Sequence, residues 1–249
     1  MDTYSEKDIV DICLLAGRIM LKSGAETHRV EDTMIRIAKA MGITDSQSYV
    51  TPTGILFSVA PTSNSYFSRI SERSTDLHKV DLVNSVSRQL ADKMVTAESA
   101  RRELNQIEKA SYAYPLWLQV IVAAFVSGCF TIMFDGSWYD FIPALIAGGV
   151  GFFAMNYFNR FIEIRFFSEF LASMFIGILA ITFVWLQWGV EIDKIIIGSV
   201  MPLVPGLLIT NAVRDLMVGH LVAGLSKGAE AFLTAFAIGA GIAVVLSFL

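Results

Sequence analysis

The second half of the chain is a series of long apolar stretches separated by short polar segments. Each stretch is close to the roughly 20 residues that a helix needs to cross the ~30 Å hydrocarbon core of a bilayer. The pattern therefore predicts five membrane-spanning helices, near residues Pro115–Phe134, Tyr139–Phe158, Ser168–Trp188, Lys194–Ala212 and Ala229–Leu249.

The fourth stretch is interrupted at its centre. Residues 195–213 carry no charge, yet Pro202-Leu203-Val204-Pro205-Gly206 lies in the middle of them. A proline inside a helix removes one backbone donor and clashes with the carbonyl four residues earlier, so a turn should unwind here. In hydrocarbon, unwound backbone is tolerated only where protein or a water-filled cavity surrounds it. The break therefore predicts either a kink that helps packing or a substrate site like those of broken transporter helices.

The first 114 residues have a more polar pattern, which predicts a separate α+β fold. Helical spacing of apolar residues predicts helices over residues 5–22 and 27–41 and one long helix from Asp76, a candidate N-cap, to residue 109. Gly42 is placed where it can cap the second helix at its C-terminal end.

Between these helices the pattern changes to alternation, which is typical of strands. Residues 49–59 and 65–70 predict a β-hairpin, and Pro52-Thr53-Gly54 interrupts its first strand as an edge or a bulge. The predicted fold class is thus an α-helical membrane protein with five spans (residues 115–249) and an N-terminal cytoplasmic α+β domain (residues 1–114).

Basic residues set the orientation of the spans, because lysine and arginine accumulate on the cytoplasmic side of a membrane. With the predicted spans, Lys194 is the basic residue on one side. Seven basic residues flank the spans on the other side: Arg101, Arg102, Lys109, Arg160, Arg165, Arg214 and Lys227. This asymmetry predicts a multi-pass protein of the cell inner membrane, with the N-terminus in the cytoplasm and the C-terminus outside.

Composition excludes several functions. A net charge of -4 gives no indication of a nucleic-acid partner. The two cysteines, Cys13 and Cys129, lie in different halves and predict no disulfide framework. His28, His78 and His220 lack metal-ligand spacing, and the chain has no phosphate-binding loop of the P-loop type. We therefore predict no metal, no cofactor and no catalytic residue.

Polar residues after the break form the candidate binding site. Asn211, Arg214 and Asp215 are three and four positions apart and can share one helix face. The amide of Asn211 can donate and accept, and the guanidinium of Arg214 can grip a carboxylate with two N–H groups. A second half-helix begins near the break, so the positive end of its dipole faces into the break. A small carboxylate suits these parts, and the predicted substrate-binding residues are Pro202, Pro205, Gly206, Asn211, Arg214 and Asp215.

Structural alternatives exist for these residues. Arg214 can be a cytoplasmic anchor paired with Asp215, and Asn211 can form a hydrogen bond between helices. Residues 24–31 can be a solvated helix start with local ion pairs.

Two features of the spans limit how transport could be driven and where another helix could pack. No predicted span has a charged residue near its centre, so proton coupling would need groups at span edges or on another chain. Small residues recur at every fourth position of the last span and could form a helix interface: Ala231, Ala235, Gly239 and Ala243.

These motifs together resemble the threonine/serine exporter family. The similarity follows nearly the whole chain in order: Gly24-Ala25-Glu26-Thr27-x-Arg29-Val30-Glu31, Pro52-Thr53-Gly54, Pro202-Leu203-Val204-Pro205-Gly206, Asn211-Ala212-x-Arg214-Asp215, Gly219, Gly224 and Glu230-Ala231. The resemblance implies a cytoplasmic N-terminal domain and a five-span membrane half. Because the chain has five predicted spans, it resembles the larger subunit of the split members, whose partner is a smaller five-span protein.

The resemblance also implies a function, namely the export of small hydrophilic metabolites driven by the proton motive force. These are threonine and serine in some members and dicarboxylates such as succinate in split members. The expected partners are a small-molecule substrate, membrane lipid, and a second five-span subunit or further copies of the chain. The alternative is a membrane-anchored cytoplasmic enzyme or sensor, in which a pair such as His28 with Glu31 carries chemistry.

Overall fold

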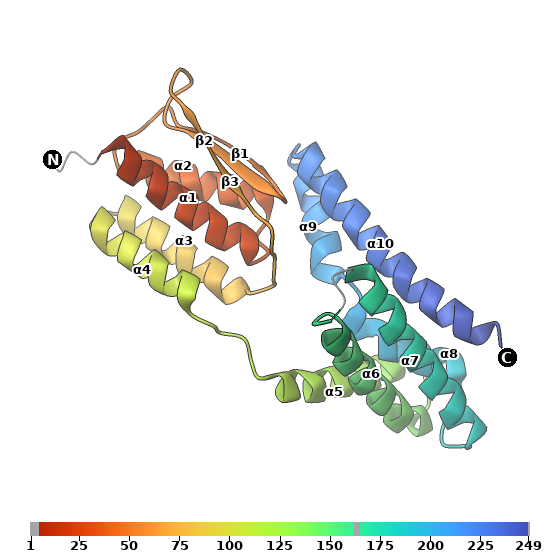
Figure 1. Cartoon of the computed structure of the whole chain (residues 1–249). Helices are drawn as coiled ribbons and strands as arrows, with labels where there is room; N and C mark the ends of the chain where they lie inside the picture. Colours follow the sequence, from red (N-terminus) through yellow and green to blue (C-terminus); the bar gives the residue numbers. More distant parts are fainter. Residues whose placement is uncertain (1–4, 162–164, 249) are drawn as a thin grey trace. The chain divides into compact units, whose positions relative to one another are not determined.

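The computed structural model describes residues 5–161 and 165–248 (Figure 1). The chain divides into two compact units. One joins Met1–Ala113 with Leu207–Gly228, and the other joins Tyr114–Gly206 with Ala229–Leu249. The first 113 residues thus share a unit with part of the segment that the hydropathy pattern assigned to the membrane half.

Before residue 110, the first unit contains four helices among its described residues, and polar side chains cap three of them. Ser5, Asp76 and Thr96 each accept a hydrogen bond from a backbone N–H three residues later, which satisfies a donor that a helix start leaves open. The predicted helices at 5–22 and 27–41 are confirmed. The bounds of the four helices are α1 Glu6–Lys22, α2 Thr27–Ala40, α3 Leu77–Ala91 and α4 Ala97–Lys109.

The prediction of one continuous helix from Asp76 to residue 109 is wrong, because α3 and α4 are separate. Lys93 has a φ of 58°, in the left-handed region that ends a right-handed helix. Thr96 then caps a new helix. The apolar spacing continues across the break, because both helices turn their apolar faces to the same core.

The strands form one antiparallel sheet in the order β1-β2-β3, with β1 Gln47–Thr51, β2 Gly54–Ser58 and β3 Ser65–Arg69. The predicted single strand over residues 49–59 is therefore wrong. Thr51 pairs with Gly54, so Pro52 and Thr53 form the turn of a hairpin rather than a bulge within a strand. Proline has no N–H to give to a ladder, which favours the turn at this position.

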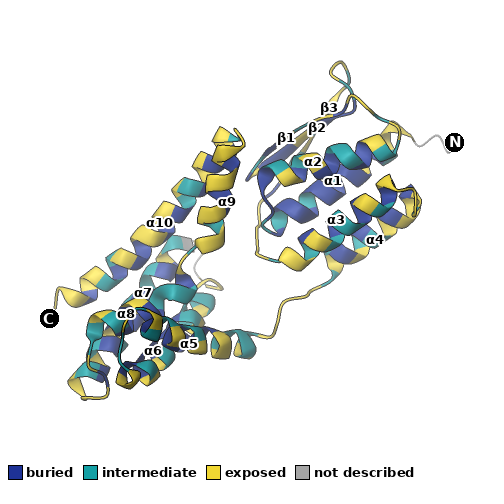
Figure 2. Cartoon of the chain, turned by 180° about the vertical axis from the view of Figure 1, so that it is seen from behind, coloured by how far each residue is buried: buried dark blue, intermediate teal, exposed yellow. Residues whose placement is uncertain are grey.

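The core of the first unit lies between the sheet and the helices α1 to α4. Its fully buried side chains include Met20 of α1, Met34 of α2, and Ile55 and Phe57 of β2. Each such side chain contributes about 1.5–3 kcal/mol by leaving water. Figure 2 shows the resulting division of these helices into buried and exposed faces.

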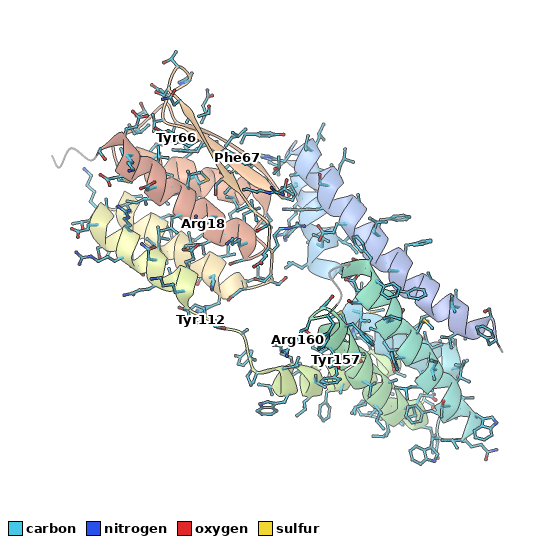
Figure 3. All side chains as sticks on the ribbon, in the orientation of Figure 1. Arg18, Tyr66, Phe67, Tyr112, Tyr157 and Arg160 are labelled. Carbon is cyan, nitrogen blue, oxygen red and sulfur yellow. The ribbon has the colours of Figure 1, made fainter. Side chains whose placement is uncertain are left out.

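The rim of this core carries an ion pair and aromatic residues of β3. Arg18 of α1 binds Glu108 of α4 at 3.0 Å. Tyr66 and Phe67 are neighbours on β3 (Figure 3). Tyr66 packs against the core, whereas the Phe67 side chain is exposed, as the alternation of a strand requires.

The second unit is a helical bundle of apolar elements, and two helices belong to both units. Among the described residues, four helices are long and apolar enough to cross a membrane, or five if α8 with η1 and α9 are counted as one broken span. The elements after residue 114 are α5 Leu116–Met133, α6 Trp138–Phe158, α7 Arg165–Trp185, α8 Ile192–Val200, η1 Met201–Leu203, α9 Gly206–Met217 and α10 Leu221–Leu246.

The predicted interruption of the fourth span is present. The α-helical pattern ends at Val200, and a single 3₁₀ turn follows it. Val204 is extended, with φ −63° and ψ 129°, and α9 begins directly after Pro205. The two prolines thus border an unwound turn, as their missing donors require.

Small residues allow the helices of the second unit to pack closely. A Cβ at Gly148 of α6 would lie 1.9 Å from Ser127 Oγ of α5. In the first turn of α6, the buried carboxylate of Asp140 accepts hydrogen bonds from the N–H groups of Val190 (2.6 Å) and Glu191 (3.2 Å), which ties the connection between α7 and α8 to α6.

The stripe of small residues on α10 is not the face that packs within this chain. Of its four residues, Ala231 is buried, whereas Ala235, Gly239 and Ala243 are exposed, and the buried face beyond Ala231 carries Thr234 and Gly241.

Candidate functional site

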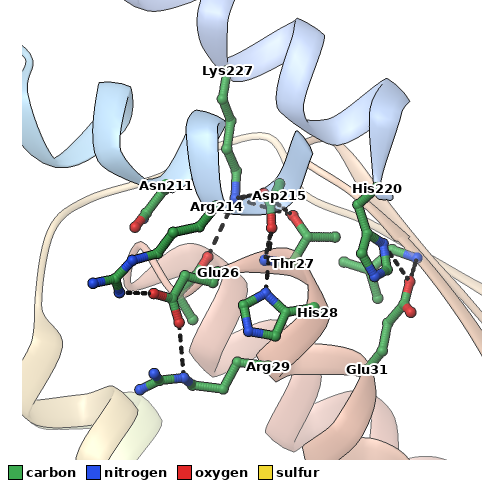
Figure 4. Close-up of polar contacts among 12 residues, drawn as sticks. Glu26, Thr27, His28, Arg29, Glu31, Asn211, Arg214, Asp215, His220 and Lys227 are labelled. Carbon is green, nitrogen blue, oxygen red and sulfur yellow. Dashed lines mark hydrogen bonds and ion pairs between the residues drawn. The ribbon is translucent and has the colours of Figure 1, made fainter. Parts of the chain in front are cut away.

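Polar side chains cluster in the first unit where the start of α2 meets α9 and the start of α10 (Figure 4). The α2 helix has no capping side chain of its own, because its N-cap residue, Glu26, makes no such bond. Asp215 of α9 supplies the missing acceptor: its Oδ1 accepts the backbone N–H of Thr27 at 3.0 Å. A carboxylate at this position also interacts favourably with the positive end of the α2 dipole.

Asp215 is also half of a buried ion pair. Its Oδ2 accepts hydrogen bonds from Lys227 Nζ at 2.7 Å and from the Thr27 hydroxyl at 2.8 Å. The Lys227 ammonium donates in addition to Thr27 Oγ1 at 3.0 Å. The side chains of Asp215 and Lys227 are 0% and 4% exposed. Two charges so far from water are tolerated because they bind each other and their remaining hydrogen-bonding groups are used.

A second group of charges centres on Glu26, whose carboxylate is buried between two arginines. One oxygen binds the guanidinium of Arg214 on α9, and the other binds Arg29 Nε of α2 at 2.9 Å. The arginine side chains are 58% and 48% exposed. Water therefore reaches the Arg214 pair from one side, in contrast to the Lys227 pair.

Two imidazoles complete the cluster. His28 Nδ1 lies 3.7 Å from Asp215 Oδ1, and His220 Nδ1 lies 3.7 Å from Glu31 Oε1. The two rings are 6.4 Å apart. Glu31 Oε1 also accepts the N–H of Val50 at 2.8 Å, and burial raises the pKa of this carboxyl. The distances of 3.7 Å are too long for hydrogen bonds, and each contact is an ion pair only when its imidazole is protonated.

Asn211 fixes the turn between α1 and α2. Its amide donates to the carbonyl oxygen of Gly24 at 2.9 Å. Gly24 has a φ of +86°, which only glycine adopts without strain, so this residue allows the carbonyl to face α9. The sequence left open a hydrogen bond of Asn211 between helices; the bond observed joins α9 to the α1–α2 turn instead.

The structure brings three of the six predicted site residues into this cluster: Asn211, Arg214 and Asp215. The predicted pairing of Arg214 with Asp215 is wrong, because adjacent residues of a helix point in different directions. Of the other three predicted residues, Pro202 and Pro205 lie at the break and Gly206 is the first residue of α9; all three belong to the second unit.

Sequence reasoning missed the partners of these residues. Lys227 was assigned to a cytoplasmic connection because the last span was expected from Ala229, whereas α10 begins at Leu221 and buries Lys227. A single lysine within an apolar stretch was the signal that could have indicated a buried partner.

The helix start at residues 24–31 was also misjudged. One expectation was a solvated helix start with local ion pairs. The local pair of Arg29 with Glu26 is present, yet Glu26 and Thr27 are buried rather than solvated. The enzyme alternative required His28 to pair with Glu31. Instead, His28 lies beside Asp215, and Glu31 lies beside His220. Among the described residues, no group of three His, Cys, Asp or Glu side chains could hold a metal ion.

The sequence of this chain is similar to those of proteins named as probable transporters or exporters. Residues 11–249 match a family described as putative threonine/serine exporter. The probable succinate transporter subunit YjjP of Klebsiella aerogenes is 24% identical over 99% of this chain and 96% of its own length. YjjP of Escherichia coli is 23% identical, with 99% and 97% covered.

The probable threonine/serine exporter of Mycobacterium tuberculosis is 22% identical over 94% of this chain, which spans only 45% of that protein. No solved structure matches the chain. Because the family match extends from residue 11 to residue 249, the chain belongs to the threonine/serine exporter family.

Proposed function

We propose that this chain is one subunit of a transporter that exports small carboxylate-bearing metabolites, either threonine and serine or dicarboxylates such as succinate. Membership of the exporter family supports a role in membrane transport. The two YjjP relatives, which are similar over almost their whole length, are named as subunits of a probable succinate transporter. The mycobacterial relative is named as a probable threonine/serine exporter.

We infer the substrate class from the Glu26 carboxylate, which is bound to Arg214 in this structure. Glu26 presents its carboxylate to a guanidinium that is 58% exposed, so water and solutes can reach the pair. An arginine guanidinium can also bind the carboxylate of a solute, often through two N–H groups. A substrate carboxylate would replace Glu26 on Arg214, and Asn211 on the same helix offers a further donor and acceptor.

The membrane arrangement that suits this function has five spans, with α8, η1 and α9 forming one broken span. The N-terminus is cytoplasmic and the C-terminus outside, in the inner membrane. Transport is secondary active and needs no catalytic step in the chain. A smaller five-span protein completes the transporter, and the mycobacterial relative, of which this chain spans less than half, is long enough to contain such a second part.

The test is counterflow in liposomes. The purified chain is reconstituted alone and with a small five-span partner, and uptake of labelled serine, threonine and succinate is measured. Mass measurement of the detergent-purified protein in both cases distinguishes a two-subunit transporter from a homo-oligomer.

Two arginine variants test the substrate site, because both arginines bind the same carboxylate. Arg214→Ala should abolish export while the protein remains in the membrane at normal amounts. Arg29→Ala, the matched control, removes the other partner of Glu26 and should retain most of the activity. Pro205→Ala should also abolish export, because it allows the helix to continue through the break.

Normal efflux from both Arg214→Ala and Pro205→Ala would exclude this site. Absence of counterflow for all three substrates, with and without the partner, would contradict the function itself.

A further inference from the structure

Two histidine–carboxylate pairs face each other where α2 meets the end of α9. His28 and Glu31 lie on one side, three residues apart on α2 and therefore on the same helix face. Asp215 and His220 lie on the other side. The pairs are crossed, since His28 is 3.7 Å from Asp215 and His220 is 3.7 Å from Glu31. Each side thus contributes one imidazole and one carboxylate.

The charges of this group do not balance when both imidazoles are neutral. Asp215 and Glu31 are two carboxylates, and the buried ammonium of Lys227 binds only the first of them. Burial raises the pKa of the Glu31 carboxyl, which favours a bound proton. One additional proton would make the group neutral.

Other charges near the group do not supply this balance. Arg29 of α2 and Arg214 of α9 both bind Glu26, and their half-exposed guanidinium groups are screened by solvent. On α10, Lys227 is already bound to Asp215. Nδ1 of His28 is buried and has no hydrogen-bond partner among the described residues, so it is available for a proton.

We propose that His28, His220, Glu31 and Asp215 form a binding site for one shared proton, and that proton binding tightens the contact of α2 with α9. A protonated imidazole donates to the carboxylate opposite it, and such charge-assisted hydrogen bonds shorten to about 2.7–2.9 Å. Both crossed pairs join α2 to α9 or to the turn after it. Any proton that strengthens the contact is in turn bound more strongly when the contact is closed.

The inference goes beyond the proposed transport function, because proton binding can be measured without any substrate. It also supplies titratable groups to a chain in which no predicted span has a charged residue at its centre. Asp215 is next to Arg214 in the sequence, so a change in the contact of α9 with α2 would reach the proposed substrate site.

Nuclear magnetic resonance tests the site directly, because the chain has three histidines and the signal of each can be assigned. The full chain, labelled with ¹³C at histidine, is titrated in detergent micelles between about pH 5 and 8, where histidine is the usual titrating side chain. The signals are assigned with His28→Gln, His78→Gln and His220→Gln. His78 is the internal control, since it is exposed and contacts Tyr112 instead.

The expected result is coupling between the two imidazoles of the site. Glu31→Gln should displace the titration curves of His28 and His220 and leave that of His78 unchanged. This substitution keeps an oxygen that can accept the N–H of Val50, so the fold is retained. If the curves of His28 and His220 are unchanged in Glu31→Gln, the shared site is refuted.

Hydrogen exchange of the Thr27 amide measures the contact itself, since this N–H is bound to Asp215. After correction for the intrinsic exchange rate, its protection should rise as the pH falls, by up to about tenfold per pH unit for one linked proton. The double variant His28→Gln/His220→Gln should lose this dependence, whereas His78→Gln should keep it. An unchanged pH dependence in the double variant would overturn the inference, whatever the outcome of the transport assay.

Discussion

The Asp215 carboxylate performs two tasks that are usually separate. It caps α2 through the N–H of Thr27, and it neutralises the buried ammonium of Lys227. The capping task means that α2 begins with the help of a residue 188 positions away in the sequence. At the scale of single residues, the start of α2 and the burial of Lys227 therefore depend on the same side chain.

Removing one partner of this ion pair should be strongly destabilising. Lys227→Met leaves the Asp215 charge buried without its counter-ion, which typically costs about 3–5 kcal/mol of unfolding free energy. The double variant Asp215→Asn/Lys227→Met should recover part of this loss, because neither charge remains. Equilibrium unfolding of the protein in detergent micelles measures both.

Lys79→Met is the control for the loss of a lysine as such. Lys79 is half-buried and donates to the carbonyl oxygen of Glu108 at 3.0 Å, an uncharged acceptor. Equal stability of the Lys227→Met and Lys79→Met proteins would show that the buried pair is not important for folding.

At the scale of elements, the helices of the second unit approach each other through glycine. Gly198 of α8 faces α5, and a Cβ at this position would lie 1.9 Å from Thr131 Oγ1 and 2.8 Å from both Ser127 O and Thr131 N. Two of these three atoms belong to the backbone and cannot rotate away. The contact of α8 with α5 therefore depends on the absence of a side chain.

Gly198→Ala should separate α8 from α5. We expect a loss of about 1–3 kcal/mol, the usual cost of overpacking, and a lower midpoint of thermal unfolding in micelles. The matched control is Gly239→Ala on α10, where a Cβ would meet no atom within 4 Å. If both variants unfold at the same temperature as the unsubstituted chain, the close approach of α8 and α5 is not needed for stability.

At the scale of the whole molecule, the two compact units do not follow the boundary between polar and apolar sequence. The helices α9 and α10 each belong partly to one unit and partly to the other. Residues 207–228, which carry five side chains of the polar cluster, therefore share a unit with the N-terminal α+β fold, whereas α10 from Ala229 onward belongs to the second unit.

Fusion proteins test the proposed five-span topology. Alkaline phosphatase, which is active only outside the cytoplasm, should be active when fused after Asp135 or at the C-terminus, and inactive when fused after Val218 in the turn between α9 and α10. The basic residues on the opposite side give the physical reason. Equal activity after Val218 and at the C-terminus would mean that α10 does not cross the membrane.

The apolar pattern alone was sufficient to predict features that depend on residues close together in the sequence. The helices at the N-terminus, the long apolar helices and the break between Pro202 and Pro205 depend on nearby residues, namely on spacing, caps and proline. Predictions based on spacing failed at Lys93 and at Pro52, because the apolar pattern continues across both turns.

The chain by itself determined that apolar helices with a proline break follow a more polar α+β segment, because hydrophobicity and backbone geometry act over a few residues. Only the tertiary structure decided which charges meet. Arg214 binds Glu26 rather than its neighbour, Asp215 binds Lys227, and His28 and His220 lie in one cluster. Arg214 and Glu26 are 188 positions apart, and their pairing depends on the fold, because a buried charge such as the Glu26 carboxylate needs the partner that the fold brings to it.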